Sequence, residues 1–206
     1  MQFDEVTDIA WDHAGHFLVT DGDLNGLNNR LLTLNAQGQV LAHWGAPGDQ
    51  PGSGPKEFNL PHALQVDACN RIWVADALNH RVQLIGSDGT YYGSIRSFND
   101  LGVYTLDLIS DPVNPLQAIL FVGASPTTGG GTGQISLFRV PMNCSANPLP
   151  SIDNLQPFTH FEVPVPTSTS TTLLHSIAVD PKTWDVYLAV LGGALPPQKW
   201  VAHWPQ

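Results

Sequence analysis

The chain contains a repeated unit, and this repeat limits the possible folds more than any other feature of the sequence. In its clearest copy, residues 58–91, three short runs rich in β-branched and aromatic residues (63–66, 71–75 and 81–85) are separated by polar turns. A Ser-Asp-Gly turn then leads into a fourth run that begins at Thr90. The pattern predicts a four-stranded antiparallel meander, which has little core of its own and must stack on similar units.

Pairs of aspartates show the spacing of the repeat. Asp12 and Asp67 are 55 positions apart (67 − 12), and so are Asp21 and Asp76 (76 − 21). Two more divergent copies follow, so four units are expected within a single all-β domain that spans residues 1–206. The approximate bounds of the units are 4–44, 58–98, 101–140 and 158–206, and a Pro-, Asn- and Ser-rich stretch, 141–157, is expected to form a surface loop.

The second unit resembles an NHL repeat, which is one blade of an NHL β-propeller. The resemblance lies in Pro61-His62-Ala63-Leu64, in Val66-Asp67 and in the segments 72–76 and 79–83. It implies a propeller of four-stranded antiparallel blades. Because NHL propellers usually have six blades, four units imply either a smaller ring that closes or one that stays open.

More narrowly, the order of these motifs resembles the propeller of peptidylglycine amidating lyases, which release glyoxylate from α-hydroxyglycine peptides. His62 and His175 occupy equivalent positions in two units and correspond, by this resemblance, to two of the three zinc ligands of that family. Asp23 stands where the family has its catalytic tyrosine, and Ser176 where it has a calcium-binding aspartate. The family's third histidine and its catalytic arginine belong to a blade that would precede Met1.

Two interpretations of the histidine pair therefore stay open. Neutral imidazoles at His62 and His175 are suitable ligands for Zn²⁺, which takes three protein ligands and a water in many catalytic sites. The alternative is a pair of structural histidines that bond to backbone groups at the mouth of the channel.

A second candidate metal site lies in the first unit. Residues 21–26 read Asp-Gly-Asp-Leu-Asn-Gly and match the first half of a calcium loop, which makes Asp21, Asp23 and Asn25 candidate Ca²⁺ ligands. The glutamate that closes such a loop is missing, because Leu32 occupies its position. A solvated Asp/Asn/Gly loop is the alternative.

Other signals favour an extracellular or cell-surface protein. Cys69 and Cys144 are predicted to form a disulfide, and Asn143 begins an Asn-Cys-Ser acceptor pattern for N-glycosylation. Low lysine usage and the Thr/Ser run 167–172 also suit an exposed extracellular surface. Free cysteines and a chance acceptor pattern are the alternatives.

Charge and hydropathy exclude some partners. Eight Lys and Arg residues against 18 Asp and Glu residues give a net charge of −10, which argues against nucleic acid and anionic membranes. No apolar run approaches the ~18 residues that a membrane helix needs, so membrane insertion is not expected.

The sequence as a whole predicts an extracellular NHL propeller that acts as a binding or assembly module without retained catalysis. Its expected partners are other copies of itself or another protein or peptide. If the ring stays open, the strand-forming segments at the two ends, 6–11 and 200–204, are expected to join copies into a homo-oligomer or filament. The alternative function is a zinc-dependent enzyme like the amidating lyases, or a fragment of one, with Zn²⁺ and Ca²⁺ as the candidate cofactors.

Overall fold

Four antiparallel sheets follow one another along the chain. The computed structural model describes residues 2–127, 131–145, 151–165, 173–191 and 196–201. The strands are β1 (Val6–Trp11), β2 (Phe17–Asp21), β3 (Arg30–Leu34) and β4 (Val40–Gly45) in the first sheet; β5 (Pro61–Val66), β6 (Arg71–Asp76), β7 (Arg81–Gly86) and β8 (Tyr91–Ile95) in the second; β9 (Gly102–Ser110), β10 (Gln117–Ser125), β11 (Gly131–Pro141) and β12 (Thr159–Val165) in the third; and β13 (Leu173–Val179), β14 (Val186–Leu191) and β15 (Gln198–Trp200) in the fourth. Two single-turn 3₁₀ helices, η1 (Pro47–Asp49) and η2 (Ala77–Asn79), lie in the connections.

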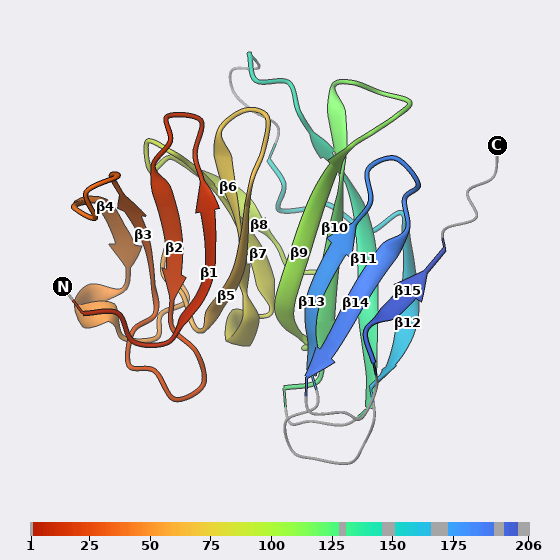
Figure 1. Ribbon diagram of the computed structural model, residues 1–206, viewed down its shortest axis with the longest axis horizontal. Coiled ribbons are helices and arrows are strands. Elements are labelled where there is room, and N and C mark those ends of the chain that lie inside the picture. The colour runs from red at the N-terminus through yellow and green to blue at the C-terminus, as the bar shows by residue number, and fades with distance from the viewer. Residues whose placement is uncertain (1, 128–130, 146–150, 166–172, 192–195, 202–206) are drawn as a thin grey trace.

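Each sheet is a meander in which neighbours in the chain are also neighbours in the sheet. The first strand of each sheet is the innermost one, since β1 packs against β5, β5 against β9, and β9 against β13. In Figure 1 these four strands occupy the middle of the molecule, while β4 and β15 lie toward its opposite ends. The sheets are therefore the four blades of a β-propeller, as the repeat predicts.

The apolar cores lie between consecutive blades. In the second blade the side chains of Ile72 and Val74 pack toward the first blade, whereas those of Trp73 and Ala75 pack toward the third. All four are fully buried, because successive side chains of a strand point to opposite faces and both faces of this blade are covered. A further core between the third and fourth blades includes Phe121, Leu137 and Ile177 among other apolar residues.

The blade boundaries differ from those expected in one place. The sequence predicts that residues 158–163 belong to the last unit, but strand β12 pairs with β11 and completes the third blade instead. In the described residues, the fourth blade has three strands, β13 to β15. Alternation of apolar and polar residues identifies a strand but not its partner, which depends on contacts that are distant in the sequence.

Part of the stretch 141–157 also differs from a simple surface loop. Ile152 is completely buried in the core between the second and third blades, and Leu155 packs against the same core. Asp153 accepts a hydrogen bond of 2.7 Å from the backbone N–H of Ser94 in β8. This segment therefore covers the outer part of the second blade.

A buried Asp–Arg pair fixes the connection between the first two blades to the second blade. The Nε of Arg81 donates to Asp76 at 2.7 Å, and its other nitrogens donate to the carbonyl oxygens of Ser53, Gly54 and Glu57. Because these carbonyls precede the second blade, Arg81 links the connection to the sheet.

A disulfide links the second and third blades. Cys69 lies in the turn between β5 and β6, and its sulfur is 2.02 Å from that of Cys144, which follows β11. Arg71 strengthens the same contact, since it bonds to Asp67 within its own blade and to the carbonyl oxygen of Pro141 in the third.

Candidate functional site

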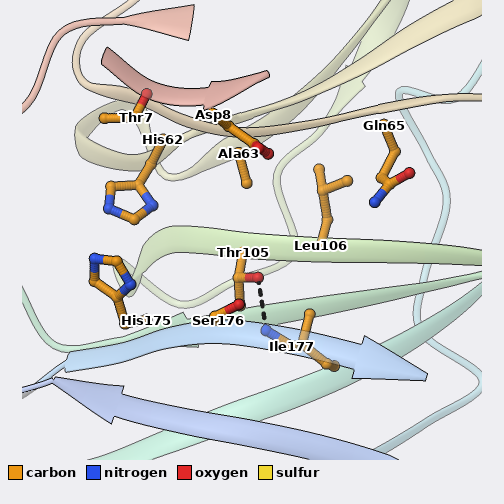
Figure 2. A pocket seen from close by; sticks show the side chains of 10 residues that line it. All are labelled: Thr7, Asp8, His62, Ala63, Gln65, Thr105, Leu106, His175, Ser176 and Ile177. Carbon is orange, nitrogen blue, oxygen red and sulfur yellow. Dashed lines mark hydrogen bonds between the residues drawn. The ribbon is translucent and has the colours of Figure 1, made fainter. Parts of the chain in front are cut away.

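The inner strands of all four blades line a half-open cavity of about 250 Å³. Figure 2 shows the side chains that line it, and most of them are polar. They are Thr7 and Asp8 from β1, His62, Ala63 and Gln65 from β5, Thr105 and Leu106 from β9, and His175, Ser176 and Ile177 from β13. The cavity thus occupies the axial position in which propellers bring distant parts of the chain together.

A β-bulge interrupts every inner strand near this cavity. The residues that the bulges leave out of register are Thr7, His62, Tyr104 and His175. A bulge bends its strand and changes the direction of the side chain at that point. Three of the four bulged residues, Thr7, His62 and His175, line the cavity, and the backbone of Tyr104 bonds to His62.

The structure brings His62 and His175 together, as their equivalent positions predict. Their ring centroids are 4.7 Å apart with nearly perpendicular planes, and Figure 2 shows the two rings on opposite sides of one space. The Nδ1 of His62 is 2.6 Å from the carbonyl oxygen of Tyr104. Because a carbonyl only accepts, Nδ1 carries the proton and Nε2 keeps a lone pair that can accept a hydrogen bond or coordinate a cation.

The surroundings of His62 favour its neutral form. Burial lowers the pKa of His62, and repulsion by a protonated His175 lowers it further, while the Tyr104 carbonyl and the carboxylate of Asp23 act in the opposite direction. Burial likewise raises the pKa of the Tyr104 phenol to about 12, so this group stays neutral as well. His62 therefore presents a neutral acceptor to the cavity near pH 7.

The two histidines place two ring-nitrogen donors beside the same cavity. Within the ranges that the structure describes, no group of three or more His, Cys, Asp or Glu side chains is placed to hold one metal ion. Catalytic zinc usually has three protein ligands, and His62 and His175 are two nitrogen donors of the right kind. Zinc binding at this position stays a prediction.

Polar side chains of one inner strand bond to the backbone of the next blade. Asp8 accepts from the N–H of Leu64 at 2.9 Å, and Asp107 accepts from the N–H of Val179 at 2.7 Å. Thr105 accepts from the N–H of Ile177 at 3.0 Å. The bond from His62 to Tyr104 follows the same pattern, so this histidine has the structural role that was one of its two interpretations.

Sequence reasoning missed Asp8, Thr105 and Asp107. A signal was available for two of them, because Asp8 lies four residues before Asp12 and Asp107 lies four residues before Asp111. Both carboxyl groups are largely buried, and burial raises the pKa of each above its usual range.

One of the three candidate calcium ligands, Asp21, is engaged in a buried network of hydrogen bonds. Asp21 is fully buried and bonds through Oδ2 to Arg30 and Asn28, and through Oδ1 to the backbone N–H of Asp4. It is the counterpart of Asp76, which pairs with Arg81 in the second blade. Asp21 therefore has a structural role, and calcium binding by Asp23 and Asn25 stays a prediction.

The candidate glycosylation site is on the surface. Asn143 is exposed beside the bonded Cys144, and its side-chain oxygen accepts a hydrogen bond of 3.2 Å from the backbone N–H of Ser145. The Thr/Ser run 167–172 lies outside the described residues.

Four meanders surround a shared polar cavity, with the His-Ala-Leu motif on β5 and the Asn-His-Arg-Val motif running from η2 into β7, and together they define an NHL-type β-propeller. The chain is 30% identical to human NHL repeat-containing protein 3 over 194 residues, which cover 93% of this chain and 48% of the human protein. The mouse protein of the same name is 39% identical over 95 residues, or 46% of this chain and 26% of that protein. The prediction of NHL repeats is confirmed, and the chain spans less than half the length of these relatives.

A comparison with solved structures agrees with the fold. A gluconolactonase from Xanthomonas campestris superposes with a TM-score of 0.53 at 18% identity, over 89% of this chain and 55% of that one, which supports the propeller fold alone. No family model matches the sequence. The narrower resemblance to amidating lyases does not appear among these relatives and stays a resemblance.

Proposed function

We propose that this chain is an extracellular binding module whose axial cavity takes a polar group of a protein or peptide partner, without lyase chemistry of its own. The observation that supports the proposal is the cavity at which four blades contribute polar side chains. The groups that face it are rich in acceptors, because the Nε2 of His62 has a lone pair and Asp8 is a carboxyl group. A ligand with N–H or O–H donors suits this lining, and a net charge of −10 disfavours anions.

The proposal of an extracellular location has separate support. Cys69 and Cys144 are bonded, and disulfides persist in oxidising compartments. The exposed Asn143 adds a position at which a secreted chain would be modified. None of the helices in the described part of the chain has the length and apolarity needed to span a bilayer.

The second candidate function is an enzyme like the amidating lyases. The observation that favours it is the pair His62 and His175, with a neutral ring nitrogen available at His62. Zn²⁺ held there would polarise the hydroxyl group of a peptidyl-α-hydroxyglycine. The site lacks an identified base, since Asp23 stands at the position of the family's tyrosine.

Titration of three probes distinguishes the two functions. The intact chain is titrated calorimetrically with ZnCl₂, with a peptidyl-α-hydroxyglycine and with the corresponding peptide amide, while glyoxylate is assayed in parallel. We expect binding of a peptide probe without release of glyoxylate, and loss of that binding in His175→Ala. The matched control is His160→Ala, since His160 is an exposed histidine on β12.

Two results would contradict the proposal. Zinc-dependent release of glyoxylate that His175→Ala abolishes would establish the lyase function instead. Absence of heat for all three probes, or equal binding by His175→Ala and the wild type, would remove the cavity as the binding site.

A further inference from the structure

The axial cavity contains a carboxyl group and hydrogen-bond acceptors but no positive side chain. Asp8 is one of the ten residues that line it, and none of the ten is a lysine or an arginine. Other aspartates of the chain, such as Asp67 and Asp76, pair with arginines. None of the ion pairs among the described residues involves Asp8. A partly buried carboxylate is stabilised by a positive partner, so a cation is the charge that this lining accepts.

The carboxyl group of Asp8 is fixed inside the channel by the first two blades. Its Oδ2 accepts a hydrogen bond of 2.9 Å from the backbone N–H of Leu64, and its Oδ1 accepts one of 2.8 Å from the N–H of Ile9. Figure 2 shows Asp8 across the cavity from Ile177 of β13. Its position is therefore defined by the inner strands and does not depend on the outer faces of the first and fourth blades.

A second carboxylate lies near the histidine end of the cavity. The β2–β3 connection, residues 22–29, is four residues longer than the equivalent connection of the second blade, residues 77–80. Asp23 belongs to this longer connection, and its negative charge acts on both His62 and Tyr104. Like Asp8, it takes part in none of the ion pairs that the described residues form. Two carboxylates without a cation thus act on one cavity.

The ring of His62 adds an acceptor between them. Its Nδ1 donates to the carbonyl oxygen of Tyr104, so its Nε2 has a lone pair for a donor in the cavity. A cation that carries N–H groups can bond to this nitrogen while the carboxylates stabilise its charge. A bare metal ion is less suited, because no group of three His, Cys, Asp or Glu side chains in the described part of the chain is placed to hold one.

The geometry favours the ammonium group of lysine over the guanidinium group of arginine. Each oxygen of Asp8 already accepts a backbone N–H, so the carboxylate does not present two free oxygens to the planar fork of an arginine. An ammonium group is a compact charge whose donors each need a single contact. Along β5 the lining extends from His62 to Gln65, which is about 10 Å. This length accommodates the four-carbon stem of a lysine.

We propose, building on the proposed function, that the cavity binds the primary ammonium group of a lysine side chain from a peptide or protein partner. Asp8 and Asp23 compensate its charge, and the Nε2 of His62 accepts one of its N–H groups. The net charge of −10 attracts a partner with exposed lysines. This binding is independent of the assembly expected at segments 6–11 and 200–204, which stays a prediction because residues 202–206 lie outside the described residues.

Probes that differ in one group test the charge of the ligand. They are Nα-acetyl-lysine methylamide, the same compound with its side-chain amine acetylated, and alanine methylamide, which has a free amino terminus. Each is titrated into the intact ¹⁵N-labelled chain with a chelator present, so that no metal ion contributes. We expect the lysine probe to bind at least about tenfold more tightly than its acetylated form. It should shift the Nε2 resonance of His62 and leave that of the exposed His160 unchanged.

The variant Asp8→Asn tests the carboxylate, because it keeps the shape and an acceptor oxygen but removes the charge. Asp107→Asn is the matched control, since Asp107 bonds in the same way to the N–H of Val179 and does not line the cavity. We expect Asp8→Asn to lose the preference for the lysine probe over its acetylated form and Asp107→Asn to keep it, with circular dichroism confirming that both are folded.

The outcomes separate this inference from the proposed function. Equal affinity of the wild type for the two lysine probes, or an unchanged preference in Asp8→Asn, would overturn the ammonium site while the cavity remains a binding site. Tighter binding of alanine methylamide than of the lysine probe would overturn the assignment to a lysine side chain. Absence of binding by every probe would overturn the proposed function as well.

Discussion

Several buried polar residues in this propeller bond to backbone groups that are distant in the sequence. His62, for example, donates to the carbonyl of Tyr104, which is 42 positions away. The ring also faces His175 of the fourth blade. This one side chain of the second blade therefore contacts the third and fourth blades and also lines the cavity. The protonation state of His62 is therefore coupled to the packing of the blades.

This coupling predicts a pH dependence of stability. The fold lowers the pKa of His62, mainly through burial and then through His175, while Asp23 and the Tyr104 carbonyl partly oppose the shift. The unfolded chain therefore binds the proton more readily, and His62 reduces the free energy of unfolding as the pH falls below the ordinary histidine value of about 6.5. Urea unfolding at several pH values should show that acid lowers the free energy of unfolding less in His62→Gln than in the wild type. His160→Gln should retain the full loss, and equal pH profiles for all three proteins would refute this origin.

The buried ion pairs predict a large effect of removing one partner. Arg81→Leu leaves Asp76 as an uncompensated buried carboxylate and frees three carbonyl oxygens of the preceding connection. We expect the free energy of unfolding to fall by about 3–5 kcal/mol. The control Arg96→Leu, at an exposed arginine, should change it by less than about 0.5 kcal/mol. Similar values for the two variants in denaturant titrations would contradict the structural role of Arg81.

Several residues of the site were predictable from the sequence. The register of the repeat places His62 five residues before Asp67 and His175 five residues before Asp180, and it also relates Asp21 to Asp76. Tyr104 was not predictable in this way, because the bulge of the third blade lies seven residues before Asp111, two positions earlier than in the other blades. Its carbonyl reaches His62 only through the packing of β5 on β9.

At the scale of elements, the strands were easier to predict than their partners. The four meanders follow from turns and alternating residues close in the sequence. Strand β12 follows a long connection, so nothing local indicates that it returns to β11 rather than starting the fourth blade. The segment that contains Ile152 is equally ambiguous, since Ile152 and Leu155 among Pro, Asn and Ser do not alternate as the apolar residues of a strand do.

The burial of Ile152 makes this segment part of the core. Ile152→Ala removes apolar atoms from the space between the second and third blades and should lower the free energy of unfolding by about 2–5 kcal/mol. Ile152→Val should cost only about 0.5–1.5 kcal/mol, because most of the volume is kept. Thermal unfolding of both variants measures the difference. A surface loop would instead give an effect near zero for both.

At the scale of the whole molecule, the extensive contacts among the described residues join consecutive blades, and the pair of His62 and His175 adds a contact between the second and fourth. Stability therefore depends mainly on each interface between neighbouring blades. The disulfide strengthens the interface of the second and third blades across a sequence separation of 75 residues. The double variant Cys69→Ala/Cys144→Ala should lose about 4 kcal/mol of unfolding free energy, on the chain-entropy account. Chemical denaturation under non-reducing conditions checks this value, and a dithiothreitol-treated wild type should match the variant. No change between oxidised and reduced wild type would contradict it.

The proposed extracellular location also predicts that a glycan on Asn143 increases the mass of the secreted chain. Expressed with a secretion signal in a eukaryotic cell, the chain should carry a glycan at Asn143 that an N-glycosidase removes, and Asn143→Gln should migrate like the treated protein. Asn114→Gln is a suitable control, since Asn114 lies outside any Asn-x-Ser/Thr pattern. Identical migration of wild type and Asn143→Gln from the secreted fraction would show that the acceptor pattern is not used.

The separation of the blades along the chain has a consequence for synthesis on the ribosome. Every strand of the first three blades pairs within a continuous segment, so each blade can form as soon as its own residues have emerged and need not wait for the C-terminus. The bond between Cys69 and Cys144 forms only after β11 has been made, because Cys144 follows that strand. When Cys144 has been made, the second blade is complete and the third lacks only β12, so the bond can join these two blades before the last strand of the third is added.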